Sequence, residues 1–518
     1  MINWRVKSLD AILATAEKKS LHRTLGAFQL TMLGIGAIIG TGIFVLTAAA
    51  AQKAGPGMMY SFIIAGFVCA VAALCYSELV AMAPVSGSAY TYTYAVMGEV
   101  MAWTVGWALV LEYAVAAAAV CVGWSGYVMG LIQKATGFVL PEALSHGPAW
   151  SIVGGMPSVD FSHGVVNVPA IIVALVITML LVKGTSESAK VNSILVAVKV
   201  TALSAFIVIT LPMISGDNFT PMLPNGWIGT QGSGVGVVGA AASIFFAYVG
   251  FDAVSTAAEE TKNPQRNVPI GLIGSLGICT IFYMLVAAGV VGSVGAQPIT
   301  SITGAVLSPD SAEFVLRCKE LAAAGSAPIV CSHEALAEVL SKLHYDQISK
   351  LVGLAASIAL PSVILMMIFG QTRIFFVMAR DGLLPEKLAD IHPKWKTPWL
   401  MTIVTGIFVA IAAAFFPVGQ LADISNSGTL FAFFMVAIAV LVLRKTDPNR
   451  ARPFKTPVVW LVAPMAAGGC LFLFFSLPTI AQLVLPIWGS VGMVIYVLYS
   501  RKHSHLGKAI AAQEAAKK

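Results

Sequence analysis

The segment from residue 27 to residue 51 most constrains how this chain can fold, because it is largely apolar and is interrupted by glycines near its middle. It is long enough to cross a bilayer as one helix. Gly40 and Gly42 flank Thr41 there, and glycine both weakens a helix and tolerates other backbone angles. Within a membrane, broken backbone survives only where protein buries it or where it lines a wet cavity. The segment therefore predicts a spanning helix that is broken in mid-membrane.

A break at this position would free backbone groups on both half-helices. The N–H groups of residues 41–43 would be available to a carboxylate, and the carbonyl groups of residues 37–39 would be available to an ammonium. An amino acid carries both of these groups. Glycines also let membrane helices approach each other closely, so this segment alone is consistent with a binding site and with plain packing.

The composition indicates a membrane protein. Of 518 residues, 58% are hydrophobic and only 11% are charged, whereas a soluble domain carries about a quarter charged residues. Apolar runs of about 20 residues recur along the whole chain, so we expect a polytopic helical protein within a lipid bilayer. The net charge of +7 then reports topology and gives no reason to expect a nucleic acid partner. Residues 1–26 lack an apolar core, so we expect no cleavable signal peptide.

We predict an all-α protein with twelve spanning helices, of which the third and the eighth are long enough to tilt or project from the membrane. The expected ranges are 27–51, 57–83, 98–131, 166–184, 190–213, 234–259, 269–294, 348–377, 398–416, 424–443, 457–477 and 481–500.

Lys and Arg set the expected orientation. Of the 31 in the chain, 24 fall in the termini and turns of one side, six fall on the other side, and Lys199 lies within a span. By the positive-inside rule both termini are cytoplasmic and the number of spans is even. We expect the protein to lie in the cell (inner) membrane. The two long outer segments, 132–165 and 295–347, are expected to be solvated loops, with a short surface helix over residues 335–343. No soluble second domain is expected.

A second interruption occurs in the sixth span. Gly250 lies near its middle, flanked by aromatic residues and followed shortly by Asp252. Because five spans separate the starts of the two broken segments, they enter the membrane from opposite sides. Gly-interrupted segments at matching positions of two inverted repeats point to a transporter site. The predicted organisation is a cytoplasmic segment (1–26), a first five-helix repeat (27–213), an inverted second repeat (234–443), helices eleven and twelve (457–500) and a cytoplasmic tail (501–518).

Few charged residues lie deep in the expected spans. They are Glu112 in span three, Lys199 in span five and Asp252 in span six, with Glu78 near the inner end of span two. A charge at mid-bilayer costs roughly 2.5–3.5 kcal/mol and usually faces the protein interior. Because burial disfavours its charged form, Lys199 is suited to gain and lose a proton. A fixed ion pair between Lys199 and Glu112 is the alternative. We expect Asp252 to cap or orient the second half of span six.

Cysteines and histidines indicate no metal site. Five of the seven cysteines fall in apolar spans and are interpreted as packing residues. Cys318 and Cys331 share one outer loop and would pair if it faces an oxidising space, so the sequence leaves that bond open. No metal-ligand spacing is present, and all eight histidines lie outside the expected spans.

Several ordered motifs resemble one known group of proteins. Residues 36–44 (Gly-Ala-Ile-Ile-Gly-Thr-Gly-Ile-Phe), followed by Ala-Gly-Pro-Gly at 54–57, resemble span one of the amino acid–polyamine–organocation (APC) superfamily. Residues 245–252 with 259–264 resemble span six of its cationic amino acid transporter-like branch. That branch includes bacterial members, and the resemblance to it runs from about residue 20 to residue 500. It is completed by Gly370–Arg373 with Met378–Pro385, and by Glu78 with Pro84–Tyr90.

The resemblance implies a LeuT-type fold, in which broken helices one and six form the substrate site between two inverted five-helix repeats. At the matching positions, the amides of Thr41, Gly42 and Ile43 would bind the carboxylate. The carbonyls of Ile38, Phe246 and Val249 would bind the ammonium, and Phe246 would also act as an occluding gate. Gly40 and Gly250 would provide the breaks.

The resemblance also implies how transport is driven. Proton-coupled members carry a lysine on span five, which Lys199 matches. In sodium-coupled relatives of this fold, a sodium ion bridges spans one and eight. Span eight of this chain has Ser357 and Ser362, which are not an adjacent pair of hydroxyls.

The type of substrate side chain is indicated by two residues. Leu360, on the part of span eight expected to face the pocket, favours an apolar or small side chain, whereas Glu112 is the one feature that favours a cationic side chain.

We therefore expect a secondary active transporter that imports neutral L-amino acids by proton-coupled symport, with cationic ones left open. A gradient-independent exchanger of amino acids or polyamines is the alternative. A channel or sensor is less favoured, because the spans supply few polar residues for a pore. We expect no cofactor, no metal and no enzyme activity, because no metal, phosphate-loop or nucleophile motif is present. An accessory subunit is neither suggested nor excluded.

Overall fold

The computed structural model describes residues 5–7, 9–10, 25–85, 88–153, 156–161, 164–184, 189–229, 233–301, 304–309 and 311–516. Most of the expected N-terminal segment lies outside the described residues, as do Ser86 and Gly87 of the motif at 84–90.

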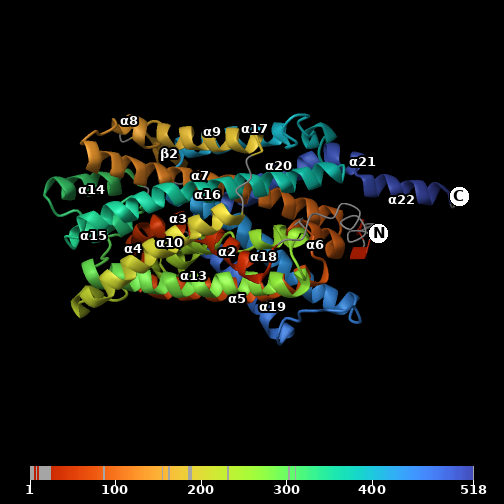
Figure 1. Cartoon of the computed structure of the whole chain (residues 1–518), viewed down its shortest axis with the longest axis horizontal. Coiled ribbons are helices and arrows are strands. Elements are labelled where there is room, and N and C mark those ends of the chain that lie inside the picture. Colours follow the sequence, from red (N-terminus) through yellow and green to blue (C-terminus); the bar gives the residue numbers. More distant parts are fainter. Residues whose placement is uncertain are drawn as a thin grey trace.

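Long helices run side by side along the longest axis of the molecule (Figure 1). The first half of the chain forms α2 (Ala27–Ile38), α3 (Thr41–Phe44), α4 (Leu46–Ala54), α5 (Met58–Met82), α6 (Ser88–Met97), α7 (Glu99–Thr136), α8 (Glu142–Ser145), α9 (Val168–Val182), α10 (Ala189–Thr210), α11 (Gly236–Ile244) and α12 (Ala253–Thr256). The second half forms α13 (Pro264–Val294), α14 (Ala312–Ala323), α15 (Ala335–Lys342), α16 (Asp346–Arg380), α17 (Trp399–Phe415), α18 (Val418–Thr446), α19 (Val459–Ser476), α20 (Thr479–Ile495), α21 (Arg501–His503) and α22 (His505–Ala516).

The two ends of the bundle differ. One end, which we call the capped end, carries α8, α14, α15 and a hairpin of β1 (Ala149–Val153) and β2 (Met156–Asp160), whose antiparallel register pairs Ala149 with Asp160. The other end, which we call the terminal end, carries α21 and α22 (Figure 1). A disulfide between Cys318 and Cys331 joins α14 to the short 3₁₀ turn Ile329–Cys331 at the capped end.

The helices are those of a polytopic membrane protein. Among the described residues, nine helical stretches are long and apolar enough to cross a membrane, and one of these runs through α4 and α5. Three further apolar helices, α2, α9 and α17, are shorter. Each of the twelve ranges predicted from sequence contains helix, and the long third and eighth helices are present as α7 and α16. α7 packs along α16 and α18, and its residues 102–121 are almost all buried.

Both predicted helix breaks are confirmed. α2 ends at Ile38, and α3 begins at Thr41 after the non-helical Ile39 and Gly40. In the sixth span, α11 ends at Ile244, a 3₁₀ turn η4 (Phe245–Tyr248) follows, and helix resumes only at Ala253. Gly250 has a φ of +109°, a conformation that residues with a Cβ rarely adopt.

The expectation that residues 295–347 form a solvated loop was wrong. The expected surface helix is present as α15, but its Leu336, Val339 and Leu340 are buried. α15 packs against α16 and α13. α15 is therefore part of the packed core at the capped end, because its apolar face needs a partner that a free loop would not supply, whereas α14 is mostly exposed, with Phe314 its one buried residue.

Glu78 on α5 ties the bundle together at the terminal end. Its carboxylate accepts two hydrogen bonds of 2.8 Å from Arg444 and one of 2.8 Å from the backbone N–H of Thr456. Arg452 lies 3.2 Å away as a second cation. Glu78 and Arg452 are both buried, so neither charge has water to replace a lost partner.

We expect Glu78→Gln to lower the free energy of unfolding by about 3 kcal/mol, because removing one member of a buried ion pair leaves the other charge uncompensated. Thermal unfolding of the purified protein in detergent measures the effect. Glu313→Gln on α14, where the glutamate is exposed, is the matched control and should leave the midpoint unchanged. Equal midpoints for the two variants would contradict the structural role of Glu78.

Candidate functional site

The two helix breaks touch each other. A Cβ atom built on Gly42 would lie 2.3 Å from the Cα of Ala247 in η4. A Cβ atom on Gly250 would lie 3.0 Å from the carbonyl oxygen of Ala37. Since real Cβ contacts are longer than this, glycine is needed at both places for the unwound segments to approach. The structure thus brings together the two breaks that the sequence analysis placed in one site.

Thr41 begins the helix that follows the first break. Its side chain is buried, and its hydroxyl oxygen has no hydrogen-bond partner. Gly123 of α7 lies directly against it, since a Cβ there would be 2.5 Å from the Thr41 methyl carbon. The first N–H groups of any helix lack partners within the helix. A buried, unpaired hydroxyl beside such N–H groups is a place where a polar ligand would be satisfied.

A tyrosine on α13 joins the carbonyl side of both breaks. The Tyr283 hydroxyl lies 2.8 Å from the carbonyl oxygen of Ile38 and 2.9 Å from that of Ala247, and it donates to these oxygens. One hydroxyl proton is shared between two acceptors, so neither carbonyl is fully saturated. The carbonyl of Phe246 accepts from the N–H of Val249 at 3.2 Å. Each carbonyl oxygen has a second lone pair, so an ammonium could still bind to Ile38 and Phe246.

Sequence reasoning missed Tyr283. The available signal was a tyrosine within the apolar seventh span, because a buried tyrosine hydroxyl usually needs a polar partner.

Lys199 on α10 is fully buried and fastens α2 to α16. Its ammonium donates to the carbonyl of Gly36 at 2.8 Å and to the Ser362 hydroxyl at 3.3 Å. The alternative of an ion pair with Glu112 was wrong, because neither carboxylate oxygen of Glu112 has a hydrogen-bond partner. Gly36 lies one helical turn before Gly40, so Lys199 binds the chain immediately before the break.

Glu112 and Asp252 form a second buried pair of groups. Asp252 accepts a 2.7 Å hydrogen bond from Tyr113, the neighbour of Glu112 on α7, and its other carboxylate oxygen is unpaired. Glu112 is close enough to Asp252 for the two charges to repel. Asp252 was expected to cap or orient the second half of span six. Capping was wrong, since its side chain makes no capping hydrogen bond to α12, and the orienting role stays a prediction. Its position is instead held by Tyr113.

At the expected side-chain end of the pocket, the structure shows how the residues are packed. Leu360 is fully buried on α16, between Ser357 and Ser362. The Ser357 carbonyl accepts from Trp124 of α7 at 2.8 Å, so this part of α16 is held against α7. Phe246 is also buried. That Leu360 faces a substrate and that Phe246 gates it both stay predictions.

An ion pair near the capped end was missed entirely. Lys53, at the end of α4, lies 3.0 Å from a carboxylate oxygen of Asp423 and donates to the Ser243 hydroxyl at 2.5 Å. Lys53 falls between the expected ranges 27–51 and 57–83 and so counted as one of the six cations of the outer side, but it is only 6% exposed. Asp423 was placed outside the tenth span, whereas α18 begins at Val418 and includes it. Neither residue stood out because each lies at the edge of an apolar run.

Comparisons with known proteins agree with this architecture. The family model described as amino acid permease matches residues 25–499. The branched-chain amino acid permease BcaP of Bacillus subtilis (strain 168) is 41% identical over 506 residues, which cover 98% of this chain and 99% of that protein. The methylthioribose transporter of the same organism is 40% identical, again over 98% and 99% of the two chains. The vacuolar cationic amino acid transporter 2 of Arabidopsis thaliana is 34% identical over 86% of this chain and 63% of its own length.

The matched region covers all the long helices and both breaks. Similarity along the full length of two bacterial transporters excludes a merely local likeness. The chain therefore belongs to the amino acid permease family within the APC superfamily, and it is a multi-pass amino acid transporter and not an enzyme.

Proposed function

We propose that this protein imports neutral, apolar L-amino acids by proton-coupled symport. The observation that carries the proposal is the contact between the two helix breaks, with the unpaired Thr41 hydroxyl on one side and the Ile38 and Ala247 carbonyls on the other. N–H groups and a hydroxyl suit a carboxylate, while carbonyls suit an ammonium. The name of the Bacillus subtilis branched-chain amino acid permease agrees with an apolar side chain.

The proposed binding mode follows the geometry of the breaks. The amides of Thr41, Gly42 and Ile43 take the carboxylate. The carbonyls of Ile38, Phe246 and Val249 take the ammonium, with Phe246 closing over the substrate. Leu360 lines the side-chain end and favours an apolar group.

The proposed fold is of the LeuT type, with twelve spans. The repeats comprise residues 27–213 and 234–443, followed by two extra helices within 457–500. Matching breaks in spans one and six support the inverted arrangement. We place both termini in the cytoplasm, by the excess of Lys and Arg at the terminal end. The capped end then faces outward, where an oxidising space would suit the Cys318–Cys331 disulfide.

We propose Lys199 as the residue that couples protons to transport. In its charged form it holds both Gly36 on α2 and Ser362 on α16. Loss of its proton removes the charge from these hydrogen bonds, which weakens them, and so frees α2 to move. Glu112 is the second candidate, because it is buried beside Asp252 without a hydrogen-bond partner. A gradient-independent exchanger is the alternative mechanism.

Uptake of a labelled branched-chain amino acid into proteoliposomes tests the proposal. We expect an inward proton gradient to increase uptake into vesicles that contain no substrate. Uptake that requires preloaded substrate and ignores the gradient would select the exchanger. Competition by unlabelled methylthioribose tests a substrate of another chemical class, which the name of one similar relative suggests. We expect none, because that compound has neither a carboxylate nor an ammonium.

Replacing Thr41 with valine keeps the side-chain volume and removes the hydroxyl. We expect every amino acid substrate to bind about fivefold more weakly, which corresponds to about 1 kcal/mol for one lost hydrogen bond. Isothermal titration or ligand-induced thermal shift measures the change. Thr136→Val, at the exposed end of α7, is the control. A change in selectivity with unchanged overall affinity would place Thr41 at the side-chain end instead.

Tyr283→Phe tests the ammonium end. We expect the substrate-free protein to lose about 2 kcal/mol of stability, because buried carbonyls lose their donor. Bound amino acid should recover part of this loss, since its ammonium donates to Ile38, so the substrate-induced rise in unfolding temperature should exceed that of the unmodified protein. Tyr92→Phe removes a buried hydroxyl that donates to the carbonyl of Ala83, the residue that follows α5, and should show no extra recovery. Equal recovery in both variants would argue against Ile38 as an ammonium ligand.

Lys199→Ala tests the coupling. We expect the stimulation of uptake by the proton gradient to disappear, while purified protein still gives a substrate-induced thermal shift. Measuring uptake with and without the gradient in the same vesicles separates an effect on coupling from an effect on the amount of protein present. Unchanged stimulation would rule out Lys199 as the coupling residue and leave Glu112.

A further inference from the structure

A cavity of about 600 Å³ lies inside the capped end. Its walls come from α4, α7, α14, the start of β1 and the start of α18. Val45 and Gly123 line it, and Gly123 also touches Thr41. The cavity therefore reaches from the capped end to the proposed carboxylate end of the substrate site, and we call it the capped cavity.

Two histidines lie side by side on the wall of the capped cavity. His146 follows α8, and His333 precedes α15. Both residues line the cavity and both are exposed, and their ring centres lie 5.1 Å apart. A solute that enters the cavity can therefore reach both imidazole rings.

The separation of the two rings suits a shared metal ion. An imidazole nitrogen binds zinc at about 2.0–2.1 Å, which puts the centre of the ring about 3.2 Å from the metal. Two such rings in tetrahedral coordination have their centres about 5.2 Å apart, and 5.1 Å separates the rings of His146 and His333. Bringing both rings onto one ion therefore needs at most a rotation of the side chains.

The hydrogen bonds of His146 leave one of its ring nitrogens available. Its Nδ1 lies 2.8 Å from the hydroxyl oxygen of Ser145, and that hydroxyl donates to the carbonyl of Glu142 at 3.4 Å. The serine oxygen then accepts from the Nδ1–H group, which leaves the lone pair of Nε2 free for a metal. A hydrogen bond to the other ring nitrogen also orients a ligating imidazole.

The surroundings of the pair are compatible with a bound cation. An imidazole binds a metal in its neutral form, and its ordinary pKa of about 6.5 leaves most of it neutral at pH 7. Lys319 also lines the cavity, but Glu142 compensates its charge at 2.5 Å. The carboxylate of Glu338 lies on the same wall and adds an attraction for a cation.

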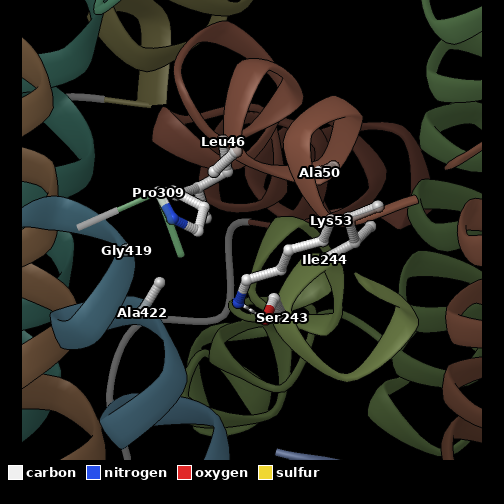
Figure 2. Close-up of a pocket in the computed structure, with 9 residues that line it drawn as sticks. Leu46, Ala50, Lys53, Ser243, Ile244, Pro309, Gly419 and Ala422 are labelled. Carbon is white, nitrogen blue, oxygen red and sulfur yellow. Dashed lines mark hydrogen bonds between the residues drawn. The ribbon is translucent and has the colours of Figure 1, made fainter. Parts of the chain in front are cut away.

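A small recess beside the capped cavity offers a cation much less. Figure 2 shows Lys53 extending across this recess to the Ser243 hydroxyl. Lys53 already compensates Asp423 at 3.0 Å, and its ammonium repels a second cation. The free space of about 10 Å³ has room for little more than one water molecule. The recess shares four wall residues with the cavity, namely Leu46, Ala49, Pro309 and Gly419.

A metal ion on the two histidines would link two outer segments of the chain. His146 lies between α7 and α9, whereas His333 lies between α13 and α16. An ion pair of Lys319 with Glu142 joins the same two segments, but its side chains are 39% and 58% exposed, and exposed ion pairs contribute little. Coordinate bonds to one ion would hold the two segments together much more firmly across the cavity.

We propose that His146 and His333 form a binding site for Zn²⁺ or a similar transition-metal ion, and that the bound ion clamps the two outer segments together and blocks transport. Within the part of the chain that the structure describes, no third histidine, cysteine or acidic residue joins them, so water completes the coordination and the site is open and reversible. No ligand spacing marks this pair in the sequence, because the two histidines lie in different segments. The block of transport rests on the proposed function, whereas the metal site does not.

Isothermal titration of the purified protein with Zn²⁺ tests the site. We expect one ion to bind at micromolar concentration. His146→Gln and His333→Gln should each weaken binding by at least about tenfold, since even the loss of an outer-shell partner of a metal ligand costs about 10–100-fold. Mg²⁺ prefers oxygen ligands and should not compete.

His344→Asn is the matched control. His344 is another exposed histidine, close after α15, and asparagine tolerates its positive φ of 65°. This variant should bind Zn²⁺ as the unmodified protein does. Zn²⁺ binding that is unchanged in both His146→Gln and His333→Gln would overturn the site.

Uptake of a labelled branched-chain amino acid into proteoliposomes, with Zn²⁺ on both sides of the membrane, tests the clamp. We expect Zn²⁺ to reduce uptake and a chelator to restore it. Each of the two glutamine variants should raise the half-inhibitory Zn²⁺ concentration by about tenfold or more. Zn²⁺ that binds through both histidines and leaves uptake unchanged would overturn the clamp.

These outcomes are separable from a failure of the proposed function, because the titration needs no amino acid. If Zn²⁺ binds through the two histidines while no amino acid is bound or taken up, the proposed substrate is wrong. If uptake proceeds and Zn²⁺ neither binds nor inhibits, the metal site alone is wrong.

Discussion

The structure depends on the contact between two stretches of unwound backbone inside the bundle. Unpaired backbone groups are costly in a membrane interior, so each break must be covered by other parts of the protein. Here each break covers the other, with Gly42 against Ala247 and Gly250 against the Ala37 carbonyl. Tyr283 then supplies a donor to one carbonyl from each break. A Cβ at either glycine would push the segments apart and uncover the groups that they now shield.

Local sequence signals were sufficient to place these breaks. Glycine weakens a helix wherever it occurs, so Gly40–Gly42 and Gly250 predicted the interruptions to within a few residues. Deeply placed charges are equally visible, because an apolar run makes Lys199, Glu112 and Asp252 stand out. The helix-forming regions followed from apolar length alone, and the structure has helix in each of the expected ranges.

Partners across the bundle could not be predicted in the same way. Lys53 and Asp423 are 370 residues apart in the sequence, and Tyr283 lies 245 residues from Ile38. Which side chains meet depends on how each helix is rotated about its axis, and one sequence does not reveal that rotation. The alternative of a Lys199–Glu112 pair failed for this reason, since the lysine points instead toward Gly36 and Ser362. Asp252 failed as a cap because Tyr113 holds it from α7.

Each half of the first broken helix has its own lysine contact to a different neighbour. Before the break, Lys199 connects α2 to α16. Beyond the break, Lys53 connects α4 to α18 and α11. An unbroken helix would transmit any movement at one contact to the other, because its backbone hydrogen bonds make it a stiff rod. The non-helical Ile39 and Gly40 remove that coupling, so in our proposal loss of the Lys199 proton frees α2 without moving α4. The break that forms the site would then also allow its two ends to open separately.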